Sequence, residues 1–209
     1  MQNDPIDHTG PPPEVDGLPR GEAARSHPPV LFNGERFRVY LTADRIAERV
    51  RELGQELSGE YAGRRPVLVG VLNGAFMFLA DLMRSMTIEC EVDFIKLSSY
   101  GDSKITSGVV RELKSIDADI EGRDVVVVED IVDTGLSMQY LVDRLQGYAP
   151  ASIRTIALLH KHEATPPGLK IDYVGFRIQD LFVVGYGLDY GQAGRNLAHI
   201  YIQDSGPDA

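Results

Sequence analysis

Apolar residues along this chain gather in three short runs, at 66–72, 125–128 and 153–159. These runs are rich in branched aliphatic residues and are shorter than most helices. They therefore predict strands that are buried on both faces, as in a parallel sheet. At 90–94, apolar and acidic residues alternate, which predicts a strand with one face in the core and the other in solvent. Shorter strands are expected near 171–176 and 181–184.

Helical spacing appears between these runs. Ile46, Val50 and Leu57 recur on one face after Thr42, which is a plausible N-cap. A second, very apolar helix is expected around 76–83. Strands that alternate with helices predict an α/β fold with a mostly parallel central sheet flanked by helices. Binding sites in such folds lie at the carboxyl ends of the strands.

The first 29 residues differ in composition from the rest. They hold seven of the twelve prolines and almost no large apolar side chains. Such a segment buries too little surface to offset its ordering entropy, so we expect residues 1–29 to form a disordered Pro-rich tail. Residues 30–205 are expected to form one folded domain, and 209 residues suffice for a substantial core.

Composition argues against a membrane or nucleic acid as a partner of this chain. No apolar stretch approaches the ~20 residues of a membrane span, and the N-terminus lacks a signal-peptide pattern. Cys90 is the single cysteine, which fits a reducing compartment, so a cytoplasmic protein with no membrane partner is expected. The formal net charge of −10 is a weak argument against binding to nucleic acid.

The segment 125–137 carries the most informative chemistry. Glu129 and Asp130 follow the run of four valines, where that strand should reach the sheet edge. The turn 133–137, rich in small and hydroxyl residues, then enters a helical stretch, an arrangement that presents backbone N–H groups to phosphate. Carboxylates beside such a cradle favour sugar hydroxyls or Mg²⁺, which indicates a sugar phosphate. The alternative is a buried strand with a solvated acidic exit and an N-capped helix.

This segment resembles the 5-phosphoribosyl-1-pyrophosphate (PRPP) binding motif of the type I phosphoribosyltransferases, in the form closest to the hypoxanthine-guanine branch. The resemblance extends from about residue 32 to residue 203. It implies the type I phosphoribosyltransferase fold, with a small purine-binding hood and a mobile flap loop over the reacting centre. The PRPP-binding residues that it implies are Glu129, Asp130, Asp133, Thr134, Gly135, Leu136 and Ser137.

The same resemblance implies a set of pyrophosphate contacts. Asn73 and Gly74 follow the run 66–72, and glycine there lets backbone N–H groups approach an anion. Many relatives carry a basic residue at the position of Asn73, so only a backbone role is expected of this loop. Ser99 and Tyr100 begin the expected flap, and Arg195 falls where a pyrophosphate-contacting arginine is expected.

For the purine base, the resemblance implies contacts from Lys161, Phe182, Val183 and Asp189. Lys161 would donate to the exocyclic oxygen of a 6-oxopurine, because an ammonium only donates and adenine offers an amino group there. Phe182 would stack on the base and the Val183 backbone would bond to its edge. The implied Mg²⁺ ligands are Glu129, Asp130 and Asp189. The histidines that flank Lys161 lack a third metal ligand at a sensible spacing and are treated as incidental.

The resemblance therefore implies a purine salvage enzyme. It would move the 5-phosphoribosyl group from PRPP to N9 of hypoxanthine or guanine, giving IMP or GMP and pyrophosphate, with Asp133 as general base and Mg²⁺ as cofactor. A homodimer or homotetramer is expected. Two alternatives remain: a phosphoribosyltransferase for another base such as xanthine, and a PRPP-sensing regulator that binds nucleic acid. The intact Asp133, the purine segment and the acidic composition favour catalysis, and no nucleic-acid partner is expected.

Overall fold

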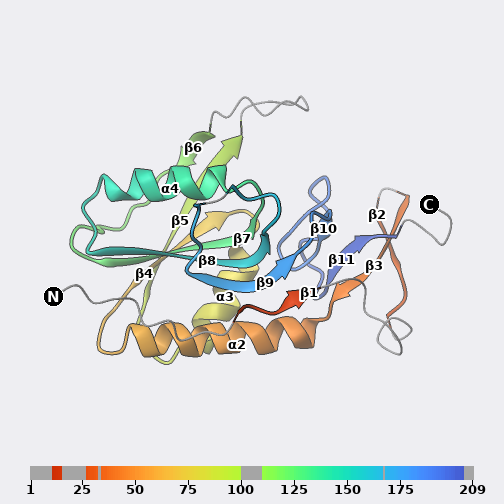
Figure 1. Cartoon of the computed structure of the whole chain (residues 1–209), viewed down its shortest axis with the longest axis horizontal. Coiled ribbons are helices and arrows are strands. Elements are labelled where there is room, and N and C mark those ends of the chain that lie inside the picture. Colours follow the sequence, from red (N-terminus) through yellow and green to blue (C-terminus); the bar gives the residue numbers. More distant parts are fainter. Residues whose placement is uncertain (1–10, 16–26, 33, 100–109, 167, 205–209) are drawn as a thin grey trace.

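A computed structural model describes most of the chain, in two sheets and the helices around them (Figure 1). The described residues are 11–15, 27–32, 34–99, 110–166 and 168–204. Tyr100 and most of the expected flap lie outside them, as does most of the expected N-terminal tail. No helix among the described residues is long and apolar enough to cross a membrane.

Within the described residues, the main sheet has seven strands, and neighbouring strands are parallel except for the last pair. In spatial order the strands are β1 (Glu14–Val15), β9 (Tyr173–Ile178), β8 (Ser152–Lys161), β7 (Asp124–Val132), β4 (Val67–Leu72), β5 (Glu91–Ser99) and β6 (Val110–Lys114). The three apolar runs of the sequence are confirmed as the adjacent strands β4, β7 and β8. The parallel α/β fold class is confirmed with them.

Helices cover both faces of this sheet (Figure 1). α2 (Ala43–Glu60) and α3 (Phe76–Ser85) pack on one face, and α4 (Leu136–Gln146) packs on the other. In β7, Val126 and Val128 join the core on the α2 and α3 side, whereas Val125 and Val127 join the core beneath α4. Burial on both faces explains why four valines follow one another without alternation.

A second, antiparallel sheet of four strands lies at one end of the described structure (Figure 1). We call it the hood. Its strands, in spatial order, are β10 (Val183–Val184), β11 (Ile200–Gln203), β3 (Glu35–Leu41) and β2 (Val30–Phe32). β3 leads into α2, whose N-cap is Thr42 as predicted, with Arg45 N donating to its hydroxyl at 3.3 Å.

The expectation of a disordered tail is wrong for residues 11–15. Glu14 and Val15 form β1, which pairs parallel with the outer edge of β9. Val15 is 4% exposed and belongs to the main core, and its carbonyl accepts a hydrogen bond from Tyr40 Oη at 2.9 Å. Proline-rich composition did not predict this strand, because its pairing depends on a sheet edge formed by residues far along the chain.

The expectation that β5 has a solvent-facing side is also wrong. Asp93 is 8% exposed, and its carboxylate accepts hydrogen bonds from the backbone N–H groups of Phe94, Asp117 and Ala118. Lys114 Nζ lies 3.4 Å from the same carboxylate. Burial alone would raise the pKa of Asp93, but these backbone donors and Lys114 outweigh it and hold the pKa below its usual value.

We predict that Asp93→Asn lowers the free energy of unfolding by about 2 kcal/mol at pH 7, because charged acceptors make the stronger hydrogen bonds. The stabilisation from Asp93 is present above the unfolded-state pKa, roughly 3.9, and is lost as the pH falls through its lower folded-state pKa. Urea unfolding at pH 7 and at roughly pH 3 measures both values. The control is Glu121→Gln, an exposed site on the following segment. A difference between Asp93→Asn and wild type that stays constant with pH would contradict this account.

Candidate active site

The site begins where the pairing of β7 with β4 ends. The two strands pair only as far as Gly70 and Val128, whereas β7 continues to pair with β8 up to Val132 and His160. The strand is therefore longer than the predicted 125–128. Glu129 and Asp130 lie within it, beside the point where the chain leaves β4. Both carboxylates therefore lie where β7 no longer pairs with β4, while the backbone remains fixed by β8.

Both carboxylates are withdrawn from water. Glu129 is 8% exposed, and its pKa is raised well above the usual value, first by burial and then by the charge of Asp130 beside it. Burial also raises the pKa of Asp130, although the positive charge of Arg195 works in the opposite direction. Two neighbouring acids with raised pKa values favour a ligand that donates hydrogen bonds or carries positive charge.

Two loops meet beside Asp130 of β7. A methyl group added at Gly74, in the turn after β4, would overlap the Asp130 carboxylate. A methyl group added at Gly187, which has φ +99°, would overlap the Gly74 carbonyl oxygen. Only residues without a side chain allow these backbones to approach so closely. Asn73 is exposed in the same turn, and the peptide bond before it is cis.

The loop after β10 is held together by one arginine. Arg195 Nη1 donates to the Gly187 carbonyl at 2.7 Å, and Arg195 Nη2 lies 2.5 Å from Asp189 Oδ1. Asp189 Oδ2 also accepts a hydrogen bond from Gln192 N at 2.8 Å. The predicted residues Asp189 and Arg195 are thus paired with each other, next to the junction of Gly74 and Asp130.

The expected metal ligands do not form a ready-made cation site. Among the described residues, no group of three or more His, Cys, Asp or Glu side chains is placed to hold a metal ion. Glu129 and Asp130 are adjacent, but Asp189 is already paired with Arg195. The donor set fits Mg²⁺ of the kind bound by one or two carboxylates together with a substrate phosphate.

The loop between β7 and α4 has free backbone donors at a helix N-terminus. Gly135 takes a left-handed conformation, with φ +77°, and no side chain caps the helix. The N-capped helix of the alternative interpretation is therefore absent. Asp133, Thr134 and Ser137 are exposed around this terminus. Uncapped N–H groups with the helix dipole behind them suit a phosphate group.

The segment after β8, which includes Thr165 and Leu169, packs against this loop. Thr165 Oγ1 donates to the Asp133 carbonyl at 2.7 Å, and His160 Nε2 lies 3.0 Å from the same hydroxyl. Since the hydroxyl hydrogen serves Asp133, His160 Nε2 is the donor in the second contact. Leu169 fills the space that a side chain at Gly135 would need. His160 thus helps to fix the backbone of Asp133, a contact that the sequence did not predict.

Lys161, the last residue of β8, lies between two carboxylates. Its Nζ is 3.0 Å from Asp133 Oδ2 and 2.7 Å from Asp180 Oδ1, and its side chain is 11% exposed. Burial alone would lower the pKa of Lys161, but the hydrogen bonds and charges of Asp180 and Asp133 raise it. Sequence reasoning placed Lys161 and Asp133 in the site but missed Asp180. Asp180 could have been suspected from the sequence, because it comes just after the strand expected near 171–176 and just before the predicted purine segment.

Phe182 presents an exposed aromatic face beside this cluster of charges. Its side chain is 49% exposed, and its ring lies 5.3 Å from Tyr190 and 6.4 Å from Phe37, centroid to centroid. Val183 is buried and pairs with Ile202 in the hood. Tyr190 and Phe37 pack against the Phe182 ring, and about half of the Phe182 surface remains exposed. Neither supporting aromatic was predicted from the sequence.

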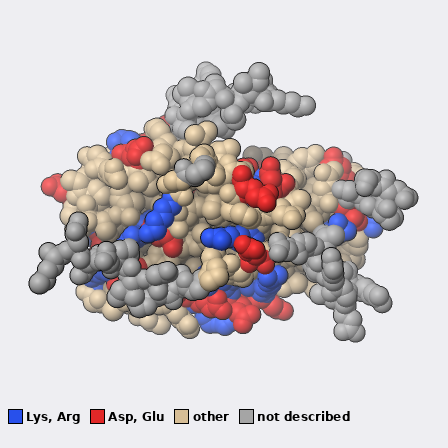
Figure 2. All heavy atoms as spheres, in the orientation of Figure 1, with Lys and Arg blue, Asp and Glu red and all other residues tan. Residues whose placement is uncertain are grey.

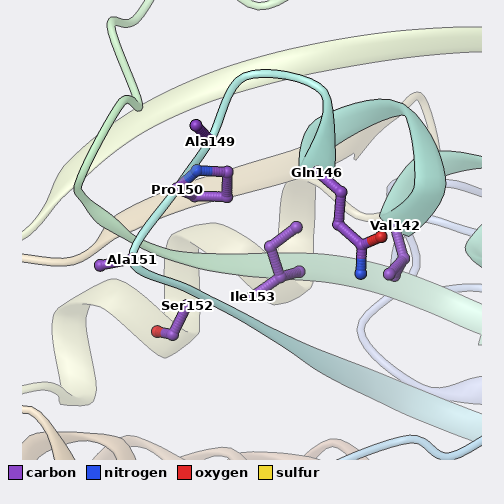
Figure 3. A pocket seen from close by; sticks show the side chains of 7 residues that line it. All are labelled: Val142, Gln146, Ala149, Pro150, Ala151, Ser152 and Ile153. Carbon is purple, nitrogen blue, oxygen red and sulfur yellow. The ribbon is translucent and has the colours of Figure 1, made fainter.

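A separate hollow of about 290 Å³ lies at the other end of β8 (Figure 3). It is formed by the end of α4 and the connection into β8. The lining residues are Val142, Gln146, Ala149, Pro150, Ala151, Ser152 and Ile153. No charged side chain lines it, and Lys161 marks the opposite end of the same strand. The chemistry of this chain is therefore concentrated at the carboxyl edge of the sheet.

An uncapped helix terminus, two buried carboxylates and an exposed aromatic ring at one sheet edge suit a ligand with a phosphorylated sugar and a planar base. Residues 39–191 match the family model described as "Phosphoribosyl transferase domain". The chain belongs to this phosphoribosyltransferase family.

Its relatives place it more narrowly, in the hypoxanthine-guanine branch. The chain is 43% identical over 165 residues to the hypoxanthine-guanine phosphoribosyltransferase of Bacillus subtilis, a match that covers 79% of this chain and 92% of that protein. It is 44% identical to the "Bifunctional protein TilS/HprT" of Listeria innocua, of whose length it spans only 26%. A solved hypoxanthine phosphoribosyltransferase from Staphylococcus aureus superposes with a TM-score of 0.76 at 36% identity, covering 79% of this chain and 90% of that one.

We predict that Gly74→Ala lowers kcat/KM for PRPP by about 10²-fold, the order of loss that a misplacement of about 1 Å causes at a reacting centre. The added methyl group would displace the Asp130 carboxylate, which a change of side-chain rotamer allows without unfolding. Initial rates with varied PRPP, together with the melting temperature, measure the two effects separately. The matched control is Gly59→Ala, because a methyl group there meets open space. Unchanged kinetics for Gly74→Ala would show that the close approach has no role in binding.

Proposed function

We propose that this chain is a purine salvage enzyme, which transfers the 5-phosphoribosyl group from PRPP to N9 of hypoxanthine or guanine and releases pyrophosphate. The observation that carries the proposal is the position of Asp133. Its carboxylate lies 3.0 Å from Lys161 Nζ, while its backbone begins the loop at the uncapped N-terminus of α4. One residue thus belongs both to the candidate phosphate cradle and to the candidate base site.

PRPP would bind along the end of β7 and the loop that follows. The 5-phosphate would accept hydrogen bonds from backbone N–H groups at Gly135 and Leu136, and from the Thr134 and Ser137 hydroxyls. Glu129 and Asp130 would face the ribose hydroxyls, directly or through Mg²⁺. Their raised pKa values support this role, because hydroxyl donors or a cation would stabilise the charged form of both acids.

The pyrophosphate would lie over the junction of the loop after β4 with the loop 185–195. The contacts that we propose for it are the backbone of Asn73 and Gly74 and the guanidinium of Arg195, with Ser99 and Tyr100 added from the family resemblance. Bound Mg²⁺, held by Glu129, Asp130 and Asp189, would supply charge stabilisation for the departing pyrophosphate.

The purine would stack on Phe182, with the Val183 backbone at its edge and Lys161 at its exocyclic oxygen. Asp133 would take the proton from N7 as N9 attacks the anomeric carbon. Its carboxylate is half-exposed and lies 3.0 Å from Lys161 Nζ, so a base held by Lys161 would lie within its reach. By analogy with its relatives, we propose a cytoplasmic homodimer or homotetramer.

We predict that Asp133→Asn lowers kcat by ~10²–10⁴-fold, which is the usual contribution of a general base, with PRPP affinity largely retained. Calorimetry with PRPP and Mg²⁺ measures affinity, and steady-state rates with hypoxanthine measure turnover. Asp143→Asn, an exposed site on α4, is the matched control. Turnover near that of wild type would remove Asp133 from the role of base.

We predict that the wild-type chain forms nucleotides from PRPP and Mg²⁺ with hypoxanthine or guanine, and not with adenine, because the Lys161 ammonium has no acceptor in an amino group. Incubation with hypoxanthine, guanine, xanthine and adenine in turn, with detection of nucleotide and pyrophosphate, tests this and also tests the alternative of a xanthine enzyme.

PRPP binding without transfer to any base would favour the remaining alternative, a PRPP-sensing regulator that binds nucleic acid. On the face seen in Figure 2, Lys and Arg are interspersed with Asp and Glu rather than gathered in a stripe, so the visible surface does not support that alternative.

A further inference from the structure

The ammonium of Lys161 is shared between carboxylates from two different strand ends. Asp180 Oδ1 is the nearer, at 2.7 Å, and Asp133 Oδ2 is at 3.0 Å. The Lys161 side chain is 11% exposed, whereas those of Asp180 and Asp133 are 67% and 50% exposed. A nearly buried cation is therefore paired with two acids that still face the open site.

From this geometry we infer that Asp180 is a positioning residue for Lys161 in the transfer reaction. It holds the ammonium so that one N–H group meets the base, and it remains as the counter-charge of Lys161 when Asp133 is neutralised. The inference rests on the proposed function, and it adds to that function a residue that touches neither the sugar nor the reacting atoms.

The first argument concerns hydrogen-bond donors. An ammonium carries three N–H donors and has no acceptor. Asp180 and Asp133 each occupy one of them, which leaves a third for the exocyclic oxygen of a purine. With Asp180 removed, the ammonium could rotate freely about its contact with Asp133. The direction of the third donor would no longer be fixed.

The second argument concerns charge during the reaction. In the ligand-free site, one cation faces two carboxylates. When N9 attacks, the bond from the anomeric carbon to pyrophosphate breaks, the N7–H bond of the purine breaks, and its proton forms an O–H bond on Asp133. The Lys161–Asp180 pair is then neutral. Without Asp180, Lys161 would pair with Asp133 alone, which would weaken Asp133 as a base, and the ammonium would be left unpaired after the transfer.

The third argument concerns why Asp180 is at this place. Lys161 pairs with Ile178 at the end of β9, and Asp180 follows two residues later. The backbone there turns sharply, with Leu181 N donating to the Gln179 carbonyl at 2.8 Å, before Phe182 enters the base site. Parallel strand ends thus bring Asp180 beside Lys161. Because the Asp180 carboxylate is 67% exposed and Lys161 keeps Asp133 as a second partner, removal of the Asp180 charge is expected to affect the reaction more than the stability.

The test is Asp180→Asn, which keeps the shape of the side chain and removes its charge. We expect kcat/KM for hypoxanthine to fall by about 10- to 100-fold, which corresponds to the free-energy contribution of one hydrogen bond to a charged group. KM for PRPP and the melting temperature should stay close to wild type. Asp180→Glu, which keeps the charge, should recover part of the loss. Gln179→Ala, the exposed neighbour, is the matched control.

A double-mutant cycle with Lys161→Met separates positioning from a general structural effect. If Asp180 acts through Lys161, Asp180→Asn should change kcat/KM for hypoxanthine by less than about twofold in the Lys161→Met background. An equal loss in both backgrounds, or no loss in the wild-type background, would overturn the inference. A wild-type protein that transfers to no base would overturn the proposed function instead, so the two failures are distinguishable.

Discussion

The parallel pairing of β7 with β8 is the constraint on which the site depends. It continues past the point where the pairing of β7 with β4 ends, so the backbone at Glu129 and Asp130 is held by β8 alone. The same register leads to the glycine turn into α4 and places Lys161 beside the loop that carries Asp133. Among the described residues, Glu129, Asp130 and Lys161 of the proposed reaction lie at strand ends, and Asp133 lies in the loop that follows β7. A geometry of this kind gives the precision that transfer chemistry needs.

The sequence predicted what depends on local composition. Val125–Val128 indicated a strand buried on both faces, because continuous burial needs no alternation, and Thr42 indicated the start of α2. The motif 129–137 and the purine segment indicated a sugar phosphate and a base at one sheet edge. The structure brings Gly74, Asp130 and Gly187 together, as a converging set of loops requires.

What the sequence did not predict depends on distant partners. β1 forms in a proline-rich segment because β9 offers an edge with free hydrogen-bonding groups. Asp93 is buried because the segment after β6 folds over it. Asp180 was not among the predicted site residues, because its place after a strand does not by itself show that it meets Lys161 at the end of the neighbouring strand. Tertiary pairing decided each case, and a single sequence carries little signal for it.

The raised pKa values of Glu129 and Asp130 have a consequence for the protein without ligand. An acid whose pKa is higher in the folded state than in the unfolded state is harder to ionise in the folded state. At neutral pH, the ionised form of this pair is therefore expected to lower the free energy of unfolding. Under the proposed function, Glu129 and Asp130 therefore serve activity at a cost in stability, as residues of functional sites often do. Neutral residues in place of these acids are therefore expected to raise the melting temperature and, under the proposed function, to lower activity.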